Sequence, residues 1–152
     1  MAGIYIHIPF CKRACHYCNF HFSTNLRLKA QMLAAIQKEM VLQKDYLNEE
    51  SIHSIYFGGG TPSLLEVEEI NLLLMHIKQL FLCEQVVEIT LEANPDDITL
   101  EKLVAFKEIG ITRLSIGIQS FQDDLLKYLN RNHSAAKARN SLEIALKAGF
   151  HN

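Results

Sequence analysis

The chain has 152 residues, of which 49% are hydrophobic and 21% charged, and its formal net charge is −2. These values are typical of a globular domain with a real core, and they give no electrostatic reason to expect nucleic acid or an anionic membrane as a partner. The most apolar stretch, "INLLLMHIKQLFL", is too short and too polar to cross a bilayer. Because no signal-peptide pattern precedes it, the sequence predicts a cytoplasmic protein with reduced cysteines.

The first predicted element is a strand over Gly3–Ile8, and it leads into three closely spaced cysteines: Cys11, Cys15 and Cys18. Three thiolates at this spacing, in a chain without a secretion signal, indicate a metal centre rather than a disulfide framework. One fitting centre is a [4Fe-4S] cluster, in which three cysteines leave the fourth iron open to another ligand. The other is a zinc site completed by His16, His21 or His7. The spacing alone leaves both centres open.

Strands and helices alternate along the rest of the chain, which predicts parallel strands joined by helical crossovers. The further strands are expected over Ile52–Phe57, Val86–Leu91 and Thr112–Ile118. Helices are expected over Leu26–Leu47, Glu66–Leu82 and Leu100–Ile109, with two more after Gln119. The end of the chain, "SLEIALKAGFHN", is typical of a helix, a glycine stop and the start of another strand. We therefore expect residues 1–152 to form one α/β domain that is the first half of a larger barrel.

Each predicted strand alternates between apolar and polar residues, so each has one oily and one polar side. The oily sides carry Ile4, Ile6, Ile8, Ile55, Phe57, Val87, Ile89, Leu91, Leu114, Ile116 and Ile118. The polar sides carry Tyr5, His7, Ser54, Tyr56, Glu88, Thr90, Glu92, Arg113, Ser115, Gly117 and Gln119. An ordinary eight-stranded barrel fills its interior with bulky apolar side chains, whereas a polar interior suits a wider, open barrel that holds a polar cofactor. A sheet with one face in solvent is the alternative, and the intervening helices favour the barrel.

A run of three glycines, Gly58–Gly60, follows the second strand in "YFGGGTPSLL". Glycines adopt backbone conformations closed to other residues and let peptide groups approach a ligand closely. The alternative is a tight turn that leads into the next helix. Because three glycines are more than a turn requires, the segment favours direct contact with a ligand.

Polar residues also stand at the carboxyl ends of the third and fourth strands, where functional residues of α/β barrels collect. Glu92 in "LEANPDD" is a carboxylate that can accept hydrogen bonds from a ribose diol. Gln119 in "GIQSF" takes the equivalent place on the fourth strand, and Arg131 follows in "YLNRNHS". Each alone could be a solvated or structural residue, but their shared placement favours a common site.

Four segments together resemble the radical S-adenosylmethionine (SAM) enzymes: "IYIHIPFCKRACHYCNF", "YFGGGTPS", "LEANP" and "GIQSF". They occur in the family's order over essentially the whole chain, and they are most similar to the branch that contains oxygen-independent coproporphyrinogen III oxidase (dehydrogenase) and the haem chaperone HemW. The resemblance implies the N-terminal half of a partial, open (β/α)6 barrel with parallel strands. It also implies a [4Fe-4S] cluster on Cys11, Cys15 and Cys18, with SAM on the open iron. The family's SAM-contacting positions correspond to Tyr5, Tyr17, Gly59, Gly60, Thr61, Glu92, Gln119 and Arg131.

The chemistry implied by the resemblance is a one-electron cleavage of SAM that gives methionine and a 5′-deoxyadenosyl radical, with the protein orienting the cofactor and excluding water. The implied partners are haem or a porphyrinogen, a haem-acceptor protein and a reductant for the cluster. No residue is expected to act as a general base in that cleavage.

Phe20 separates the two members of the branch, because the oxidase pattern has a further cysteine at this position. Its absence favours a HemW-like haem chaperone over oxidative decarboxylation of coproporphyrinogen III. A metal-binding module without independent activity is a third hypothesis, since half a barrel leaves a sheet edge unpaired. Among isolated residues, His133 is interpreted as a cap-region or surface residue rather than a haem ligand, and His7 as packing near the cluster. Cys83 is expected to be a buried small apolar residue.

Overall fold

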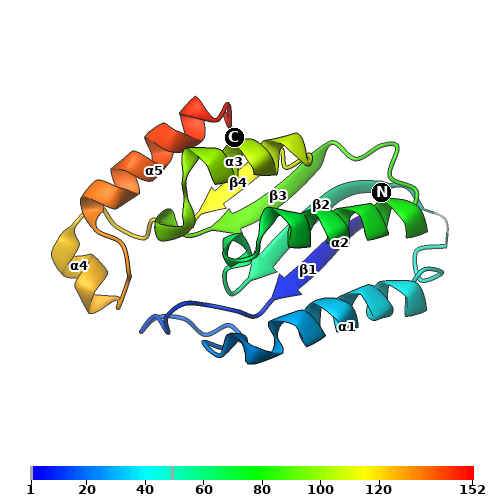
Figure 1. Ribbon diagram of the computed structural model, residues 1–152, viewed down its shortest axis with the longest axis horizontal. Helices are drawn as coiled ribbons and strands as arrows, with labels where there is room; N and C mark the ends of the chain where they lie inside the picture. Colours follow the sequence, from blue (N-terminus) through cyan, green and yellow to red (C-terminus); the bar gives the residue numbers. More distant parts are fainter. Residues whose placement is uncertain (1, 49) are drawn as a thin grey trace.

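Four parallel strands form one sheet, in the order β1-β2-β3-β4, within residues 2–48 and 50–152, which are the residues that the computed structural model describes (Figure 1). The strands are β1 (Ala2–Ile8), β2 (Ile52–Gly59), β3 (Glu88–Ala93) and β4 (Arg113–Ile116). Parallel neighbours need a crossover between each pair, and the chain crosses over through α1 (Lys29–Leu42), α2 (Val67–Leu80) and α3 (Leu100–Glu108). After β4 come α4 (Asp123–Tyr128) and α5 (Ala135–Lys147). The predicted parallel α/β fold is confirmed.

The oily side of the sheet packs against the helices and forms the core. Ile6, Phe57 and Leu91 lie beside one another in the register of β1, β2 and β3, and each is at most 3% exposed. The facing stripe of α2 consists of Ile70, Leu73, Leu74 and Ile77. Burying one such side chain stabilises the fold by about 1.5–3 kcal/mol. The apolar side chains that alternate along the strands therefore pack against the apolar stripe of α2, and together they form one apolar layer.

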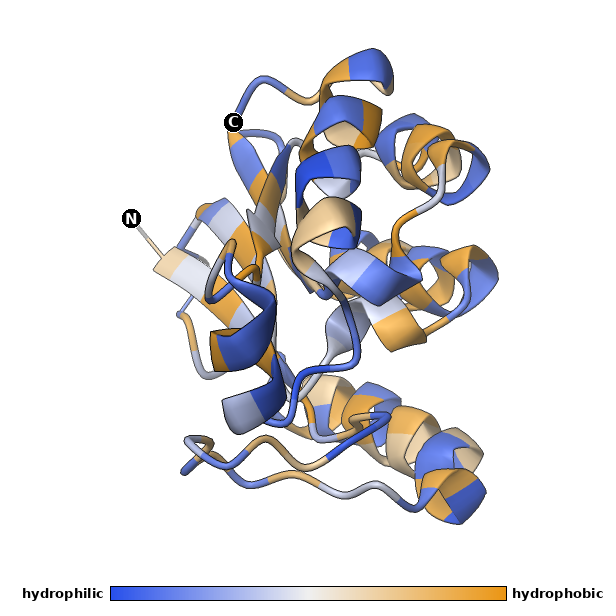
Figure 2. Cartoon of the chain, turned by 90° about the vertical axis from the view of Figure 1, so that its left-hand side faces the viewer, coloured by the Kyte–Doolittle hydropathy of each residue, from blue (hydrophilic) through white to orange (hydrophobic). Residues whose placement is uncertain are grey.

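The other side of the sheet keeps the polar residues that the strand alternation predicts. Figure 2 views the molecule from the carboxyl ends of the strands, and α2 and α3 lie to the right of the sheet in this view. Tyr5 and Tyr56, paired in the β1–β2 register, stack with ring centroids 5.9 Å apart on the opposite side. Thr90 on this side is fully buried, bonded to Glu88 and Arg113.

Several predicted boundaries were wrong. The helix expected over Leu26–Leu47 is a 3-10 turn, η1 (Leu26–Leu28), followed by α1, which ends at Leu42 because the polar segment after it turns, with Asn48 left-handed at φ 46°. The third strand begins two residues later than expected and ends at Ala93, because pairing with Ile116 of β4 sets its end. Val87, assigned to an oily side, therefore lies outside the strand and is 78% exposed.

Single residues also depart from expectation. Cys83 is only half-buried, because it lies in the loop after α2 and packs on the margin of the core. His133 directly precedes Ser134, the N-cap of α5, but it is 5% exposed rather than a surface residue. The backbone N–H of Leu114 in β4 donates to the carbonyl of Asn152 at 3.2 Å, so Asn152 lies beside the sheet. In the described part of the chain, no helix has the length and apolar character needed to cross a membrane.

Candidate functional site

A cavity lies at the carboxyl ends of the strands and gathers most of the residues predicted from the sequence. These strand ends point toward the left of Figure 1. The predicted residues that line the cavity are Cys11, Cys15, Tyr17, Cys18, Gly59, Gly60, Thr61, Glu92, Gln119 and Arg131. They come from the loop after β1, the end of β2, the end of β3 and the segments after β4. Residues up to 120 positions apart in sequence therefore share one site, at the edge where α/β barrels carry their chemistry.

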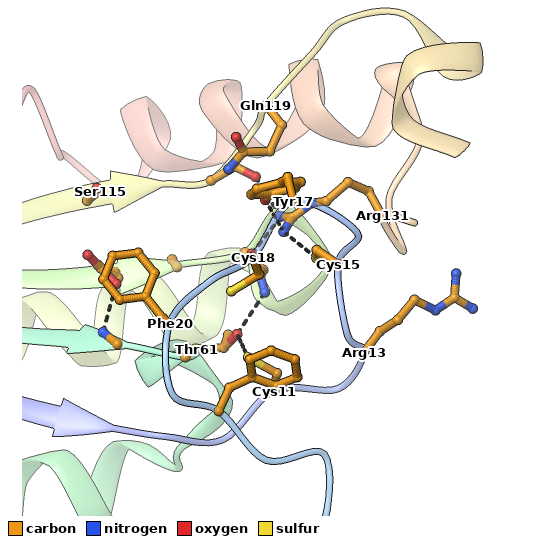
Figure 3. Close-up of a pocket in the computed structure, with 17 residues that line it drawn as sticks. Cys11, Arg13, Cys15, Tyr17, Cys18, Phe20, Thr61, Ser115, Gln119 and Arg131 are labelled. Atoms are coloured by element: carbon orange, nitrogen blue, oxygen red, sulfur yellow. Dashed lines mark hydrogen bonds between the residues drawn. The ribbon is translucent and has the colours of Figure 1, made fainter. Parts of the chain in front are cut away.

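The cysteine loop follows β1, and the three cysteine side chains face the cavity (Figure 3). The backbone N–H of Cys18 donates to the carbonyl of Cys15 at 3.2 Å, which closes a turn between the last two cysteines. On the first cysteine, the Thr61 hydroxyl donates to the Cys11 sulfur at 3.5 Å. Burial raises the pKa of the Cys11 thiol, and the nearby Cys18 and Cys15 sulfurs raise it further. The hydrogen bond from Thr61 acts in the opposite direction and lowers the pKa. Binding a metal must therefore displace a proton from Cys11.

The sulfurs do not stand in the arrangement of a single-metal site. Within residues 2–48 and 50–152, no three His, Cys, Asp or Glu side chains are grouped so that they could hold one metal ion. The donor set itself, three soft thiolates on one short loop, suits a [4Fe-4S] cluster, in which each cysteine binds a different iron. The assignment of the cysteines as ligands therefore rests on their spacing and their shared cavity.

Glu92, at the end of β3, has both carboxylate oxygens held. The Tyr56 hydroxyl donates to one oxygen at 2.7 Å, and the Gly59 backbone N–H donates to the other at 3.1 Å. Burial raises the pKa of Tyr56, and the carboxylate of Glu92 raises it further. Each carboxylate oxygen can accept another hydrogen bond, so Glu92 is fixed in orientation and still able to accept from a diol.

The glycine segment runs close to the backbone after β1. The Gly60 N–H donates to the Ile8 carbonyl at 2.8 Å, and a Cβ at Gly60 would come within 2.7 Å of the Phe10 carbonyl oxygen. Gly59 has φ 110°, which L side chains rarely adopt, and a Cβ there would meet the His7 ring at 2.6 Å. The sequence predicted close approach to a ligand here; the contact that the structure shows is close approach to the neighbouring segment of the chain.

Arg131 approaches the cysteine loop from the α4–α5 connection (Figure 3). One terminal nitrogen lies 3.4 Å from the Cys15 sulfur and 3.3 Å from the Tyr17 hydroxyl. The other donates to the Asn94 side chain and the Gly117 carbonyl, both at 2.6 Å. Its Nε is buried and has no hydrogen-bond partner within residues 2–48 and 50–152. A fixed guanidinium with one free N–H suits a carboxylate ligand.

Two predicted SAM-contacting residues differ from the others in setting. Tyr5 does not line this cavity, because it lies three residues before the end of β1 and stacks on Tyr56. It is linked to the site through Tyr56, whose hydroxyl holds Glu92. Gln119 lines the cavity with φ 63°, a conformation rarely adopted by residues other than glycine and often found at functional sites.

Sequence reasoning missed several residues that line the cavity: Arg13, Phe22, Ala93, Asn94, Ser115 and Gly117. Two of these carried a usable signal. Asn94 lies in the same "LEANP" segment as Glu92, and its amide donates to the Thr61 hydroxyl at 3.0 Å. Ser115 lies on the predicted polar side of the fourth strand, which ends at Ile116, two residues earlier than expected, so that Gln119 lies in the loop after it. Arg13 gave no signal, because a cation beside a cysteine motif is common on solvated loops. Phe20, noted as the residue in place of a cysteine, also lines the cavity and is 69% exposed.

His133 anchors the loop that carries Gln119, because its ring Nε2 lies 3.0 Å from the Ile118 carbonyl. A carbonyl only accepts, so the hydrogen bond assigns the proton to Nε2. Nδ1 is buried without a partner in the described residues. Burial lowers the pKa of His133, and the positive charge of Arg131 lowers it further. The hydrogen bond to the Ile118 carbonyl acts in the opposite direction and raises the pKa. Burial therefore favours the neutral form of the ring.

This neutrality predicts a loss of stability in mild acid. Because the folded-state pKa of His133 is below its unfolded value of about 6.5, the unfolded chain binds the proton more readily. The contribution of the neutral His133 ring to the free energy of unfolding is fully present above about pH 6.5. It declines as the pH falls toward the folded-state pKa, by up to about 1.4 kcal/mol per pH unit. His133→Gln keeps an N–H for Ile118 and should show a shallower slope in urea unfolding between about pH 5 and 7. Equal slopes for the two proteins would contradict the prediction.

A parallel α/β sheet with a three-cysteine loop and a glycine segment at its carboxyl edge defines a class of protein, and comparison with known families agrees with it. The family model of the radical SAM superfamily matches residues 5–152, so the chain belongs to the radical SAM superfamily. The haem chaperone HemW of Haemophilus influenzae is 40% identical over 97% of this chain and 40% of its own length. HemW of Bacillus subtilis is 38% identical over 100% of this chain and 41% of its own length. The chain therefore spans about two fifths of the length of these relatives.

Solved structures show the same architecture. Coproporphyrinogen III oxidase HemN from Escherichia coli, a radical SAM enzyme, superposes with a TM-score of 0.87 at 29% identity, over 98% of this chain and 35% of that protein. Methylornithine synthase PylB superposes with a TM-score of 0.61 at 15% identity over 97% of this chain, which shows a likeness of fold alone.

Proposed function

We propose that residues 1–152 form the cluster- and SAM-binding part of a HemW-like haem chaperone of the cytoplasm. The observation that carries the proposal is the single cavity shared by three cysteines, the glycine segment, Glu92 and Arg131 at the carboxyl ends of the strands. The similarity to two HemW proteins at 38–40% identity supports haem as the molecule that the whole protein handles. The haem-acceptor protein and the reductant for the cluster belong to the same proposal.

The residues of the cavity divide into two groups by chemistry. Cys11, Cys15 and Cys18 would hold three irons of a [4Fe-4S] cluster and leave one iron for SAM. When bound, the two groups would together supply one-electron cleavage of a carbon–sulfur bond.

The remaining residues bind and orient. Glu92, fixed by Tyr56 and Gly59, accepts from the ribose diol. Arg131 has a free Nε–H for the carboxylate of SAM, and its contact with Cys15 keeps that group beside the cluster loop. Gln119, Tyr17 and the Gly59–Thr61 backbone complete the walls. Tyr5 acts indirectly, through its stacking on Tyr56.

The alternative function is oxygen-independent oxidation of coproporphyrinogen III, which the structural similarity to HemN favours. Phe20 argues against it, because this exposed residue stands on the cavity rim where the oxidase pattern has a further cysteine. A third candidate is a metal-binding module without activity of its own. β1 and β4 are the edge strands of the described sheet, which keeps that candidate open.

The deciding experiment is anaerobic cluster reconstitution of the full-length protein, followed by haem titration and by coproporphyrinogen turnover with SAM. Tight haem binding without decarboxylation is the expected result. Turnover of coproporphyrinogen would contradict the chaperone proposal and support the oxidase function. Zinc instead of iron after anaerobic purification would support the metal-binding module.

A further inference from the structure

The two ends of the cysteine loop are held by different parts of the chain. At the first end, the backbone of Cys11 donates to the Ser23 carbonyl at 3.0 Å, and Ser23 donates to the Pro9 carbonyl at 2.6 Å. This end is therefore fixed by a nearby segment of the same loop. The second end, residues 13–18, has the Cys15–Cys18 turn as its local backbone pairing, and its other backbone partner and several of its side-chain partners lie more than 110 residues away.

His16, between the second and third cysteines, is bonded twice to the end of α4. Its backbone N–H donates to the Leu129 carbonyl at 3.2 Å. Its ring Nδ1 lies 2.7 Å from the Tyr128 carbonyl, which assigns the ring proton to Nδ1. Both carbonyls stand at the carboxyl end of α4, where helices leave carbonyl groups without partners. The cysteine loop therefore caps α4, and α4 in turn holds the loop.

Asn130 makes two further contacts with the loop through one side chain. Its amide N–H donates to the Ala14 carbonyl at 2.7 Å, and its amide oxygen accepts from Arg13 at 3.4 Å. Asn130 also has φ 59°, the left-handed conformation in which helices often end. Glycine would satisfy that backbone conformation equally well, so the backbone alone does not account for asparagine. The asparagine amide supplies both the donor and the acceptor that this loop uses.

The support behind Asn130 is rigid. Leu126 of α4 is 1% exposed, and its carbonyl accepts from the Arg131 N–H at 2.9 Å. The Ala135 N–H at the start of α5 donates to the Asp123 side chain at 2.8 Å, which ties α5 to the start of α4. A side chain on such a support holds its partner in place better than one on a free loop.

We propose that residues 128–131, with Asn130 as the main positioning residue, form a clasp that fixes the Cys15–Cys18 half of the loop before any metal binds. The clasp orders the turn whose two sulfurs face the cavity, so that less conformational freedom is lost when a ligand binds. The benefit of the clasp to cluster assembly rests on the proposed function. The ordering of the Cys15–Cys18 turn does not, because it is a property of the metal-free protein.

The test measures how accessible each cysteine is in the metal-free, reduced, full-length protein. Alkylation by iodoacetamide is followed site by site with mass spectrometry in Asn130→Gly, which keeps the backbone conformation and removes both side-chain bonds. We expect Cys15 and Cys18 to react about three- to tenfold faster, with Cys11 and Cys83 unchanged. Asn130→Asp keeps the acceptor for Arg13 but puts a charged carboxylate oxygen where the N–H bonds the Ala14 carbonyl, so it too should raise the rates at Cys15 and Cys18.

Asn48→Gly is the matched control, because Asn48 is also left-handed, at φ 46°, but is exposed and precedes β2, at the end of the sheet away from the cysteine loop. It should leave the rates at Cys11, Cys15 and Cys18 unchanged. Unchanged rates at Cys15 and Cys18 in Asn130→Gly, or an equal rise at all four cysteines, would overturn the clasp. Slower cluster reconstitution in Asn130→Gly is the second expected readout. If the unsubstituted protein takes up no cluster while the thiol rates change as expected, the proposed function fails and the clasp stands.

Discussion

Replacing Cys15 by alanine is expected to abolish assembly of a four-iron cluster in the full-length protein. Three protein ligands are the fewest that hold a cluster with one open iron, so removing one leaves two irons without a protein ligand. The substitution also removes the sulfur that Arg131 contacts at 3.4 Å, which loosens the positive wall of the cavity. After anaerobic reconstitution, iron should fall from about four per chain to less than about one, measured by iron and sulfide analysis.

Cys83→Ala is the matched control for this experiment. Cys83 is a half-buried thiol like the other three, but it packs on the margin of the core after α2. Its replacement should leave the iron content at about four per chain. A Cys15→Ala protein that keeps a four-iron centre and still cleaves SAM would remove Cys15 from the ligand set.

The parts of the site that the sequence predicted are those encoded by local patterns. The spacing of the cysteines, the glycine run and the alternation that places Glu92 on a polar strand side all depend on residues within a few positions of one another. The carboxyl ends of parallel strands meet at one edge, so local patterns on separate strands converge once the strands are assigned. This geometry is why Cys11, Gly60 and Glu92 line one cavity although each was found independently.

The parts that could not be predicted depend on packing between distant segments. Tyr5 has the polar alternation of His7, but its distance from the end of β1 and its stacking on Tyr56 keep it out of the cavity. The clasp on the cysteine loop depends on where α4 ends, and nothing near Asn130 in the sequence indicates a partner at Ala14. Likewise, the burial of His133 depends on the Ile118 carbonyl, which the loop after β4 turns toward it.

Gly60→Ala is expected to lower the free energy of unfolding by about 1–3 kcal/mol, the range for forcing extra atoms into a packed site. The added Cβ would lie 2.7 Å from the Phe10 carbonyl oxygen and 3.0 Å from both the Ile8 carbonyl oxygen and the Phe10 nitrogen. All three are backbone atoms, so no side-chain rotation relieves the contact. The segment after β1 must move instead, and that segment leads directly to Cys11. Urea unfolding of the metal-free protein measures the loss.

Gly3→Ala separates this effect from the general cost of filling a glycine in the sheet. Its Cβ would meet the Ser54 hydroxyl at 2.8 Å, which a change of rotamer can relieve, and the Ser54 carbonyl only at 3.5 Å. Alanine also reduces the freedom of the unfolded chain, so the change in stability should stay within about 1 kcal/mol. If the two variants were equally destabilised, contact with the β1 backbone would not be the reason for glycine at position 60. A further outcome is that only Gly60→Ala is destabilised and that it also binds SAM more weakly than the unsubstituted protein. In that outcome, the contact of Gly60 with the backbone after β1 accounts for both losses. The reason is that the end of β1, which leads to the cysteines, holds the glycine segment that faces the cavity.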